Sequence, residues 1–98
     1  MAIVPFDQRD GVIWFNGEFV PWKDAKVHVL THGLHYGSSV FEGIRAYATP
    51  KGTAIFRLTD HLERMYESAR IHRMRIPYSL GDLHEACRQI VRNNRLTK

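Results

Sequence analysis

The sequence predicts an α+β domain in which two helices pack on an antiparallel sheet. Two observations support this prediction: strand-like runs separated by turn signals occupy the chain up to residue 57, and two segments with helical periodicity follow them. Strands that precede helices, instead of alternating with them, are typical of α+β architecture. A length of 98 residues suits one small domain. We assign residues 1–11 to a loose N-terminal lead-in and residues 12–98 to that domain.

The first strand pair is predicted from two aromatic and β-branched runs, residues 12–15 and 19–22. The three residues between them, Asn16-Gly17-Glu18, contain an Asn-Gly pair. This pair is a strong hairpin signal because both residues tolerate positive φ. Pro21 is expected to end the second strand or to lie at a sheet edge.

The next segments are predicted from shorter signals. Residues 27–30 (Val-His-Val-Leu) are expected to form a short strand, followed by a loop or helical turn that ends near Glu42. Residues 43–48 and 53–57 are expected to form a second strand pair, joined through the turn residues Thr-Pro-Lys-Gly at 49–52.

Two helices are predicted after residue 58. Thr59 is expected to cap the first, whose apolar stripe recurs at helical spacing: Leu62, Met65, Tyr66 and Ala69. Pro77 breaks the chain, and Ser79 with Asp82 resembles a capping box in which Asp replaces the usual Glu. The second helix is expected to end at Asn93-Asn94 and to present an apolar face of Leu80, Leu83, Cys87, Ile90 and Val91. On that face Cys87 is expected to be a small buried hydrophobe.

Composition excludes several classes of function. The formal charge is +4, but the basic residues are dispersed and aromatics are not interleaved with them, so nucleic acid is not an expected partner. No apolar run reaches the ~18 residues that a membrane span needs, and no signal peptide is recognisable. Because Cys87 is the only cysteine, an intrachain disulfide is impossible, and the expected location is cytoplasmic.

Chemistry-bearing residues concentrate in residues 31–45, which hold two histidines, a tyrosine, a carboxylate, an arginine and three glycines. Glycines so spaced permit close approach of the backbone to a ligand. His28, His32 and His35 have spacings compatible with metal ligands, but only Glu42 could complete a set nearby and Gly33 weakens a helix there. We therefore expect these histidines to make local hydrogen bonds and expect no metal.

The pattern His35-Tyr36-Gly37, a short gap, then Val-Phe-Glu-Gly-Ile-Arg-Ala-Tyr at 40–47 resembles the signature of the fold-type IV, or class IV, pyridoxal-phosphate aminotransferases. Within that fold, Tyr36, Phe41, Gly43 and Arg45 are most similar to the branched-chain amino acid type. The resemblance covers all but residues 1–10 and corresponds to the small N-terminal domain of these enzymes. The larger C-terminal domain, with its Schiff-base lysine, has no matching positions here.

The resemblance implies a role for several residues. Arg64 aligns with an arginine that holds the cofactor phosphate, and a guanidinium fork suits phosphate oxygens. Tyr36 is either an ordinary core aromatic or a substrate-pocket residue acting in the neighbouring subunit. Phe41 would line the pocket for a branched side chain, and Gly43 would leave room beside it. Arg45 is either a surface charge of a strand or a residue at the pocket rim.

The resemblance also implies an activity. The whole enzyme would use pyridoxal 5'-phosphate to transfer an amino group between leucine, isoleucine or valine and 2-oxoglutarate, in amino-acid biosynthesis and as a homodimer or other homo-oligomer. None of the four lysines lies in a motif like the Schiff-base site (Lys23, Lys26, Lys51 and Lys98). The 98-residue chain alone is therefore expected to be an inactive fragment that lacks its C-terminal domain. Two alternatives stay open: a D-amino acid or (R)-amine transaminase of the same fold, and a non-catalytic fragment that binds a partner.

Overall fold

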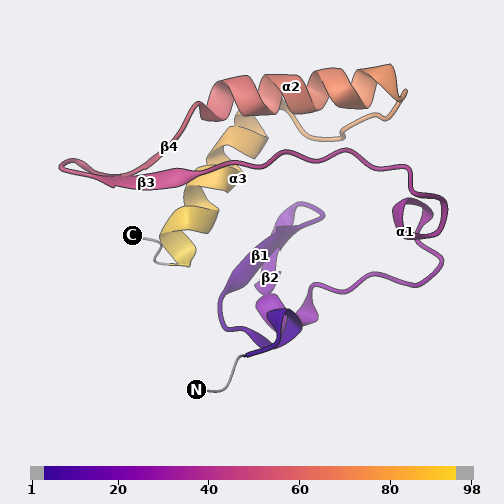
Figure 1. The fold of residues 1–98 in the computed structure, drawn as a ribbon, viewed down its shortest axis with the longest axis horizontal. Helices are drawn as coiled ribbons and strands as arrows, with labels where there is room; N and C mark the ends of the chain where they lie inside the picture. Colours follow the sequence, from indigo (N-terminus) through magenta and orange to yellow (C-terminus); the bar gives the residue numbers. More distant parts are fainter. Residues whose placement is uncertain (1–3, 95–98) are drawn as a thin grey trace. The chain divides into compact units, whose positions relative to one another are not determined.

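The computed structural model describes residues 4–94 and confirms the α+β class (Figure 1). The strands in this part of the chain form two separate two-stranded antiparallel sheets instead of one sheet. The chain divides into two compact units, with the boundary between Ser38 and Ser39. The assignment of residues 12–98 to one domain stays a prediction.

The first unit contains the predicted Asn-Gly hairpin. Strands β1 (Val12–Phe15) and β2 (Glu18–Pro21) pair antiparallel, and Phe15 lies opposite Glu18. The turn is therefore the two residues Asn16 and Gly17, whose φ angles are 51° and 93°. Both are positive, as a tight hairpin turn requires. Glu18 belongs to the strand, and β2 ends at Pro21 as expected.

Short 3₁₀ helices flank this hairpin. The lead-in contains η1 (Phe6–Gln8), and η2 (Trp22–Asp24) directly follows β2. The indole N–H of Trp22 donates a hydrogen bond to the carbonyl oxygen of Phe6. The Arg9 guanidinium lies 4.2 Å from the centre of the Phe6 ring. The Trp22 hydrogen bond attaches the lead-in to the segment that leaves the hairpin, whereas the Arg9 contact lies within the lead-in.

The strand expected at residues 27–30 is wrong, because these backbone groups bond locally. The Leu30 N–H donates to Nδ1 of His28 at 3.0 Å, and the Thr31 N–H donates to the His28 carbonyl at 2.9 Å. A helical turn, α1 (His32–Tyr36), follows. It ends at Gly37, five residues before the expected Glu42, because the positive φ of 73° at Gly37 takes the chain out of the helix.

The second unit opens its secondary structure with a hairpin of β3 (Ala46–Thr49) and β4 (Gly52–Ile55). Both strands are shorter than predicted, although one further hydrogen bond joins the Phe56 N–H to the Arg45 carbonyl at 2.8 Å. Residues 43–45 are not strand. This leaves the glycine-containing segment before β3 as an open loop.

Helix α2 (Leu58–Ile71) begins at an unexpected residue. Its N-cap is Arg57, with φ 50°, so Thr59 lies inside the helix and the predicted Thr59 cap is wrong. The left-handed turn at Arg57 lets the chain enter the helix directly after β4 and buries Leu58, which is 6% exposed. The Arg57 side chain donates to Asp60 in the first turn, at 2.8 Å.

Helix α3 (Leu80–Asn93) has the predicted boundaries. The Asp82 N–H donates to the Ser79 hydroxyl at 3.0 Å and the Ser79 N–H donates to the Asp82 carboxylate at 3.4 Å. The capping box is therefore confirmed, with Asp as its acidic member. Asn94 is the C-cap, as its position after the apolar stripe suggested.

A small core forms where α2 and α3 contact each other. The buried apolar residues are Leu58, Leu62, Ala69, Leu83 and Ala86. Cys87 is only half-buried, so the expectation that it is a buried hydrophobe overstated its burial, although partial burial raises the pKa of its thiol. The Tyr66 hydroxyl donates to the Tyr78 carbonyl and so holds the interhelical linker against α2. No helix within residues 4–94 is long and apolar enough to cross a bilayer.

Candidate functional site

Three side chains of the second unit meet in one hydrogen-bonded group. Glu42 comes from the loop before β3, and His61 and Arg64 come from α2. A spacing of three residues places His61 and Arg64 on the same helix face, one turn apart. We call these three residues the Glu42 cluster.

Glu42 uses both carboxylate oxygens in this cluster. Its Oε2 accepts from Nε of Arg64 at 2.8 Å, and its Oε1 accepts from Nη2 of Arg64 at 2.6 Å. Nδ1 of His61 lies 2.8 Å from the same Oε1. An ionised carboxylate only accepts hydrogen bonds, so Nδ1 of His61 carries the proton. The Arg64–Glu42 pair is thus bidentate, the geometry in which a guanidinium holds a carboxylate most firmly.

The charges of the cluster follow from these contacts. The hydrogen bond from Arg64, and then the one from His61, lower the pKa of Glu42 to about 2. The carboxylate is therefore ionised at neutral pH. Its side chain is only 7% exposed, whereas that of Arg64 is 66% exposed. A nearly buried anion consequently holds one edge of a cation whose other edge faces solvent.

Arg64 retains donors that the cluster does not use. A guanidinium has five N–H groups. Two of them donate to Glu42, so three remain on Nη1 and Nη2. Two adjacent nitrogens with free N–H groups form the fork that binds two oxygens of a phosphate or carboxylate. The arrangement therefore suits an anionic oxygen ligand at the exposed edge.

The predicted pocket residues Phe41, Gly43 and Arg45 occupy the same loop as Glu42. Phe41 is 86% exposed, and a methyl group added at Gly43 would meet no atom within 4 Å. Arg45 is exposed, and its carbonyl oxygen accepts the hydrogen bond from Phe56 beside the hairpin. The loop thus presents a large apolar ring next to open space, with Glu42 between them turned towards α2.

Tyr36 lies in the first unit, at the end of α1. It is 70% exposed, so it is not a core aromatic of this chain. Its ring contacts those of His32 and His35, at centroid distances of 4.9 Å and 4.8 Å. No group of three or more His, Cys, Asp or Glu side chains within residues 4–94 is arranged to hold a metal ion.

The residue-by-residue reading of the sequence did not assign roles to Glu42 and His61. One signal was available: the run His61-Leu-Glu-Arg64 repeats two basic residues at a spacing of three on a helix, and Glu42 is the acidic residue of the glycine-containing loop. Only the fold shows that this acid and these bases, about twenty residues apart, are partners.

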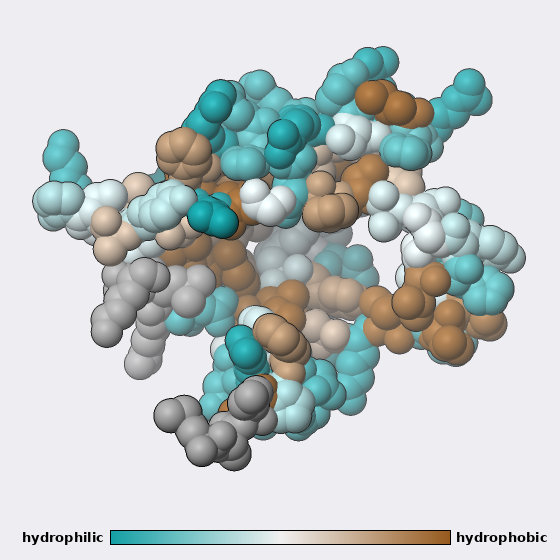
Figure 2. All heavy atoms as spheres, in the orientation of Figure 1, coloured by the Kyte–Doolittle hydropathy of each residue, from teal (hydrophilic) through white to brown (hydrophobic). Residues whose placement is uncertain are grey.

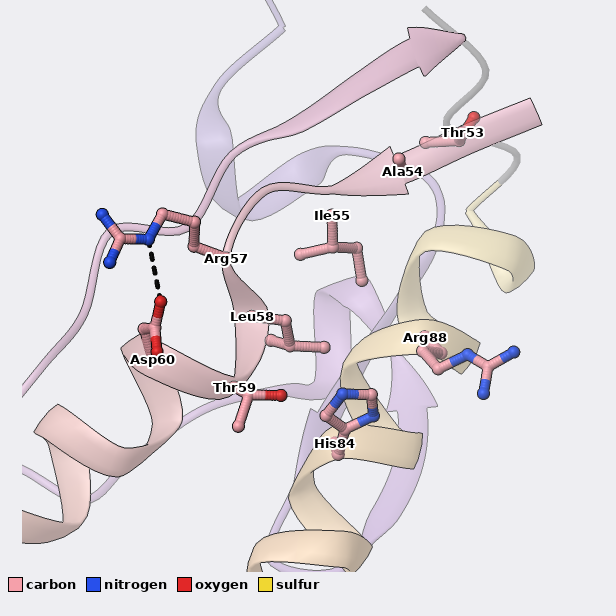
Figure 3. Close-up of a pocket in the computed structure, with 9 residues that line it drawn as sticks. All are labelled: Thr53, Ala54, Ile55, Arg57, Leu58, Thr59, Asp60, His84 and Arg88. Carbon is pink, nitrogen blue, oxygen red and sulfur yellow. Dashed lines mark hydrogen bonds and ion pairs between the residues drawn. The ribbon is translucent and has the colours of Figure 1, made fainter. Parts of the chain in front are cut away.

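A hollow apart from the Glu42 cluster lies between β4, the start of α2, and α3 (Figure 3). Its basic side chains are Arg57, which is paired with Asp60, and His84 and Arg88 from α3. Arg88 is 3.8 Å from Glu85 and therefore also has an acidic neighbour. The hollow is open and its arginines are already paired. Its lining contains none of the candidate site residues that the sequence predicted: Tyr36, Phe41, Gly43, Arg45 and Arg64.

Comparison with known proteins independently supports the resemblance to the class IV aminotransferases. The family model described as "Amino-transferase class IV" matches residues 39–98, a segment that begins where the second unit begins. The branched-chain-amino-acid aminotransferase of Pseudomonas aeruginosa is 61% identical over 88 residues, which are 90% of this chain and 29% of that protein. The corresponding protein of Escherichia coli K12 is 55% identical over 85 residues, 87% of this chain and 28% of that protein.

A solved structure is also similar. It is the T.th. branched-chain amino acid aminotransferase in complex with N-(5'-phosphopyridoxyl)-L-glutamate, with a TM-score of 0.86 and 56% identity over 89% of this chain and 29% of that chain. This chain therefore spans less than a third of the length of the relatives that it matches. The family match extends over more than half of the chain and includes every member of the Glu42 cluster. On these grounds, the chain belongs to the class IV amino-transferase family.

Proposed function

We propose that this chain is the N-terminal part of a pyridoxal-phosphate-dependent branched-chain amino acid transaminase. The observation that carries the proposal is the exposed, bidentately held guanidinium of Arg64, whose unused N–H edge fits a phosphate group. Two relatives named as branched-chain-amino-acid aminotransferases support the substrate class. The phosphopyridoxyl ligand of the T.th. structure supports the cofactor.

In this proposal the residues of the chain bind and position, and they do not carry out the bond chemistry. Arg64 donates to the cofactor phosphate through Nη1 and Nη2. Phe41 provides apolar surface for the branched side chain of leucine, isoleucine or valine, and Gly43 keeps the space beside it open. Arg45 stands at the rim of the pocket. Bound pyridoxal phosphate supplies the electron sink for amino-group transfer with 2-oxoglutarate.

The proposal includes assembly and location. Large side chains are exposed on the segment that leads into α1 and on α1 itself: Val27, Val29, Leu30, Leu34 and Tyr36. Figure 2 shows brown, hydrophobic surface over the segment that leads into α1. Exposed apolar groups of this kind mark surfaces that partners cover. We assign them to contacts with the rest of the enzyme and with a second subunit of a homo-oligomer, in which Tyr36 reaches the neighbouring subunit's substrate. A role in cytoplasmic amino-acid biosynthesis completes the proposal.

The test uses what we call the complete enzyme, in which these 98 residues are continued by the remainder of the Pseudomonas aeruginosa relative. Amino-group transfer to 2-oxoglutarate is measured for leucine, isoleucine and valine, with D-alanine and an (R)-amine as competing donors. The proposal expects the three branched L-amino acids to have the highest kcat/KM. Preference for a D-amino acid or an (R)-amine would replace it with one of the other transaminases of this fold.

A second measurement uses the 98 residues alone. Pyridoxal phosphate is added to the purified chain, the mixture is reduced with borohydride, and modified lysines are mapped. We expect scattered low-level labelling and no transamination. Stoichiometric labelling of one lysine, together with turnover of an amino donor, would show that the chain is a complete enzyme and would overturn the proposal.

A further inference from the structure

The Arg64 side chain is held in its orientation by another residue of the chain. A free arginine side chain samples many rotamers, and immobilising it on ligand binding carries an entropic cost. In this protein two nitrogens of Arg64 donate hydrogen bonds to the carboxylate of Glu42. The Glu42 side chain is only 7% exposed and is also hydrogen-bonded to His61. The guanidinium plane is therefore oriented before any ligand arrives.

We propose that Glu42 is a positioning residue that holds Arg64 in the orientation in which its free edge binds the cofactor phosphate. The inference rests on the proposed function, because it assumes that Arg64 is the phosphate contact. His61 serves as the second anchor: by donating to Oε1 it restricts rotation of the Glu42 carboxylate. The loop between Ser39 and Arg45 thus contributes to cofactor binding through a residue that does not touch the cofactor.

The sign of the effect separates positioning from simple electrostatics. A carboxylate close to a phosphate repels it, so a purely Coulombic role predicts that removing the charge of Glu42 tightens cofactor binding. A positioning role predicts that the same change weakens cofactor binding. Without Glu42, ordering of the guanidinium takes place on binding and reduces the binding free energy. The two effects oppose each other, and measurement of one affinity shows which is larger.

The matched control is provided by the same helix. Glu67 and Arg70 also form a bidentate pair, and both side chains are exposed. Glu67→Gln therefore removes an acidic partner of an arginine and the same unit of charge as Glu42→Gln. It does so at a pair to which we assign no cofactor contact, which isolates the effect of orientation at Arg64 from a general change in charge.

The experiment titrates the apo form of the complete enzyme with pyridoxal phosphate and, separately, with pyridoxal, which lacks the phosphate. We expect Glu42→Gln to weaken pyridoxal phosphate binding about 3-fold to 10-fold, the cost of immobilising one long side chain. Pyridoxal binding should stay unchanged, and Glu67→Gln should alter neither affinity. When Arg64 is already alanine, Glu42→Gln should have no further effect.

Each other result has a defined meaning. Unchanged or tighter pyridoxal phosphate binding in Glu42→Gln would overturn the positioning role, as would an equal loss for both ligands, which indicates a structural role. If Arg64→Ala itself leaves pyridoxal phosphate binding unchanged, the proposed phosphate contact fails, and the inference fails with it. Glu42→Asp is the second variant should Glu42→Gln not fold. It keeps the charge but shortens the reach to Arg64, and it should weaken binding of the phosphate form alone.

Discussion

The carboxylate of Glu42 accepts two hydrogen bonds from the guanidinium of Arg64, at 2.8 Å and 2.6 Å, although the residues are 22 positions apart. This pair connects the glycine-containing loop to the first turns of α2. It also brings an acidic residue to which the sequence assigned no role against the basic residue selected as a phosphate ligand. The loop and the helix therefore meet at the candidate cofactor contact.

Arg64 is expected to contribute by geometry as well as by charge. In the complete enzyme, Arg64→Ala should weaken pyridoxal phosphate binding about 10-fold to 100-fold, the range for loss of a charge-assisted hydrogen bond. Arg64→Lys should recover only part of the loss, because an ammonium cannot form the planar fork. Titration of the apo-enzyme measures both values. Full recovery by lysine would show that charge alone is required.

Stability at acid pH should depend on Glu42. Its pKa is lowered from 4.5 to about 2 in the fold, so the unfolded chain binds a proton at higher pH than the folded chain. The stability contributed by Glu42 is therefore fully present above pH about 4.5 and is lost as pH falls towards about 2. Denaturant unfolding of the unmodified chain and its Glu42→Gln variant, from about pH 6 down to about pH 2, measures the difference. Parallel curves for the two chains would contradict this prediction.

The capping box at α3 should have a measurable effect. Ser79→Ala removes the acceptor for the Asp82 N–H and is expected to cost about 1 kcal/mol of unfolding free energy. Thr59→Ala is the matched control, because Thr59 lies inside α2 and is not its cap. Thermal or denaturant unfolding of both variants gives the comparison. A larger loss for Thr59→Ala than for Ser79→Ala would mean that the helix boundaries are wrong.

The contact between α2 and α3 should depend on Leu62. This side chain is 2% exposed, and Leu62→Ala is expected to cost about 2–5 kcal/mol, from lost burial and the cavity left behind. Ile71, at the end of the same helix, is 68% exposed, so Ile71→Ala should stay within about 0.5 kcal/mol of the unmodified chain. Denaturant unfolding checks both. Equal losses would place the core elsewhere.

Tyr36 should act on substrate and not on cofactor. In the complete enzyme, Tyr36→Phe is expected to raise the KM for the amino acid while pyridoxal phosphate affinity stays unchanged. Whether it acts across subunits is tested by pairing a Tyr36→Ala subunit with one that lacks the Schiff-base lysine. The single lysine-bearing site then receives an intact Tyr36 from its neighbour and should be active. Activity no higher than in either mutant homodimer would exclude action across the interface.

Features that depend on neighbouring residues were predicted from the sequence. The Asn16-Gly17 turn and the capping box of Ser79 with Asp82 both formed as expected. Each is determined by hydrogen bonds and φ preferences within a few residues, and so is the apolar stripe of the helices. The resemblance to the family and the choice of Arg64 as a candidate phosphate contact could likewise be predicted from the sequence, because both depend on local motifs.

Features that depend on distant contacts were decided only by the tertiary structure. Residues 27–30 have a strand-like composition but pair with no strand among residues 4–94, so their backbone groups form hydrogen bonds within a local turn instead. The start of α2 was set by the left-handed turn at Arg57 as the chain leaves β4. Above all, the sequence contains 14 lysines and arginines, any of which could pair with Glu42. Coulomb attraction does not select among them, whereas the path of the chain does, by bringing the loop before β3 against one face of α2.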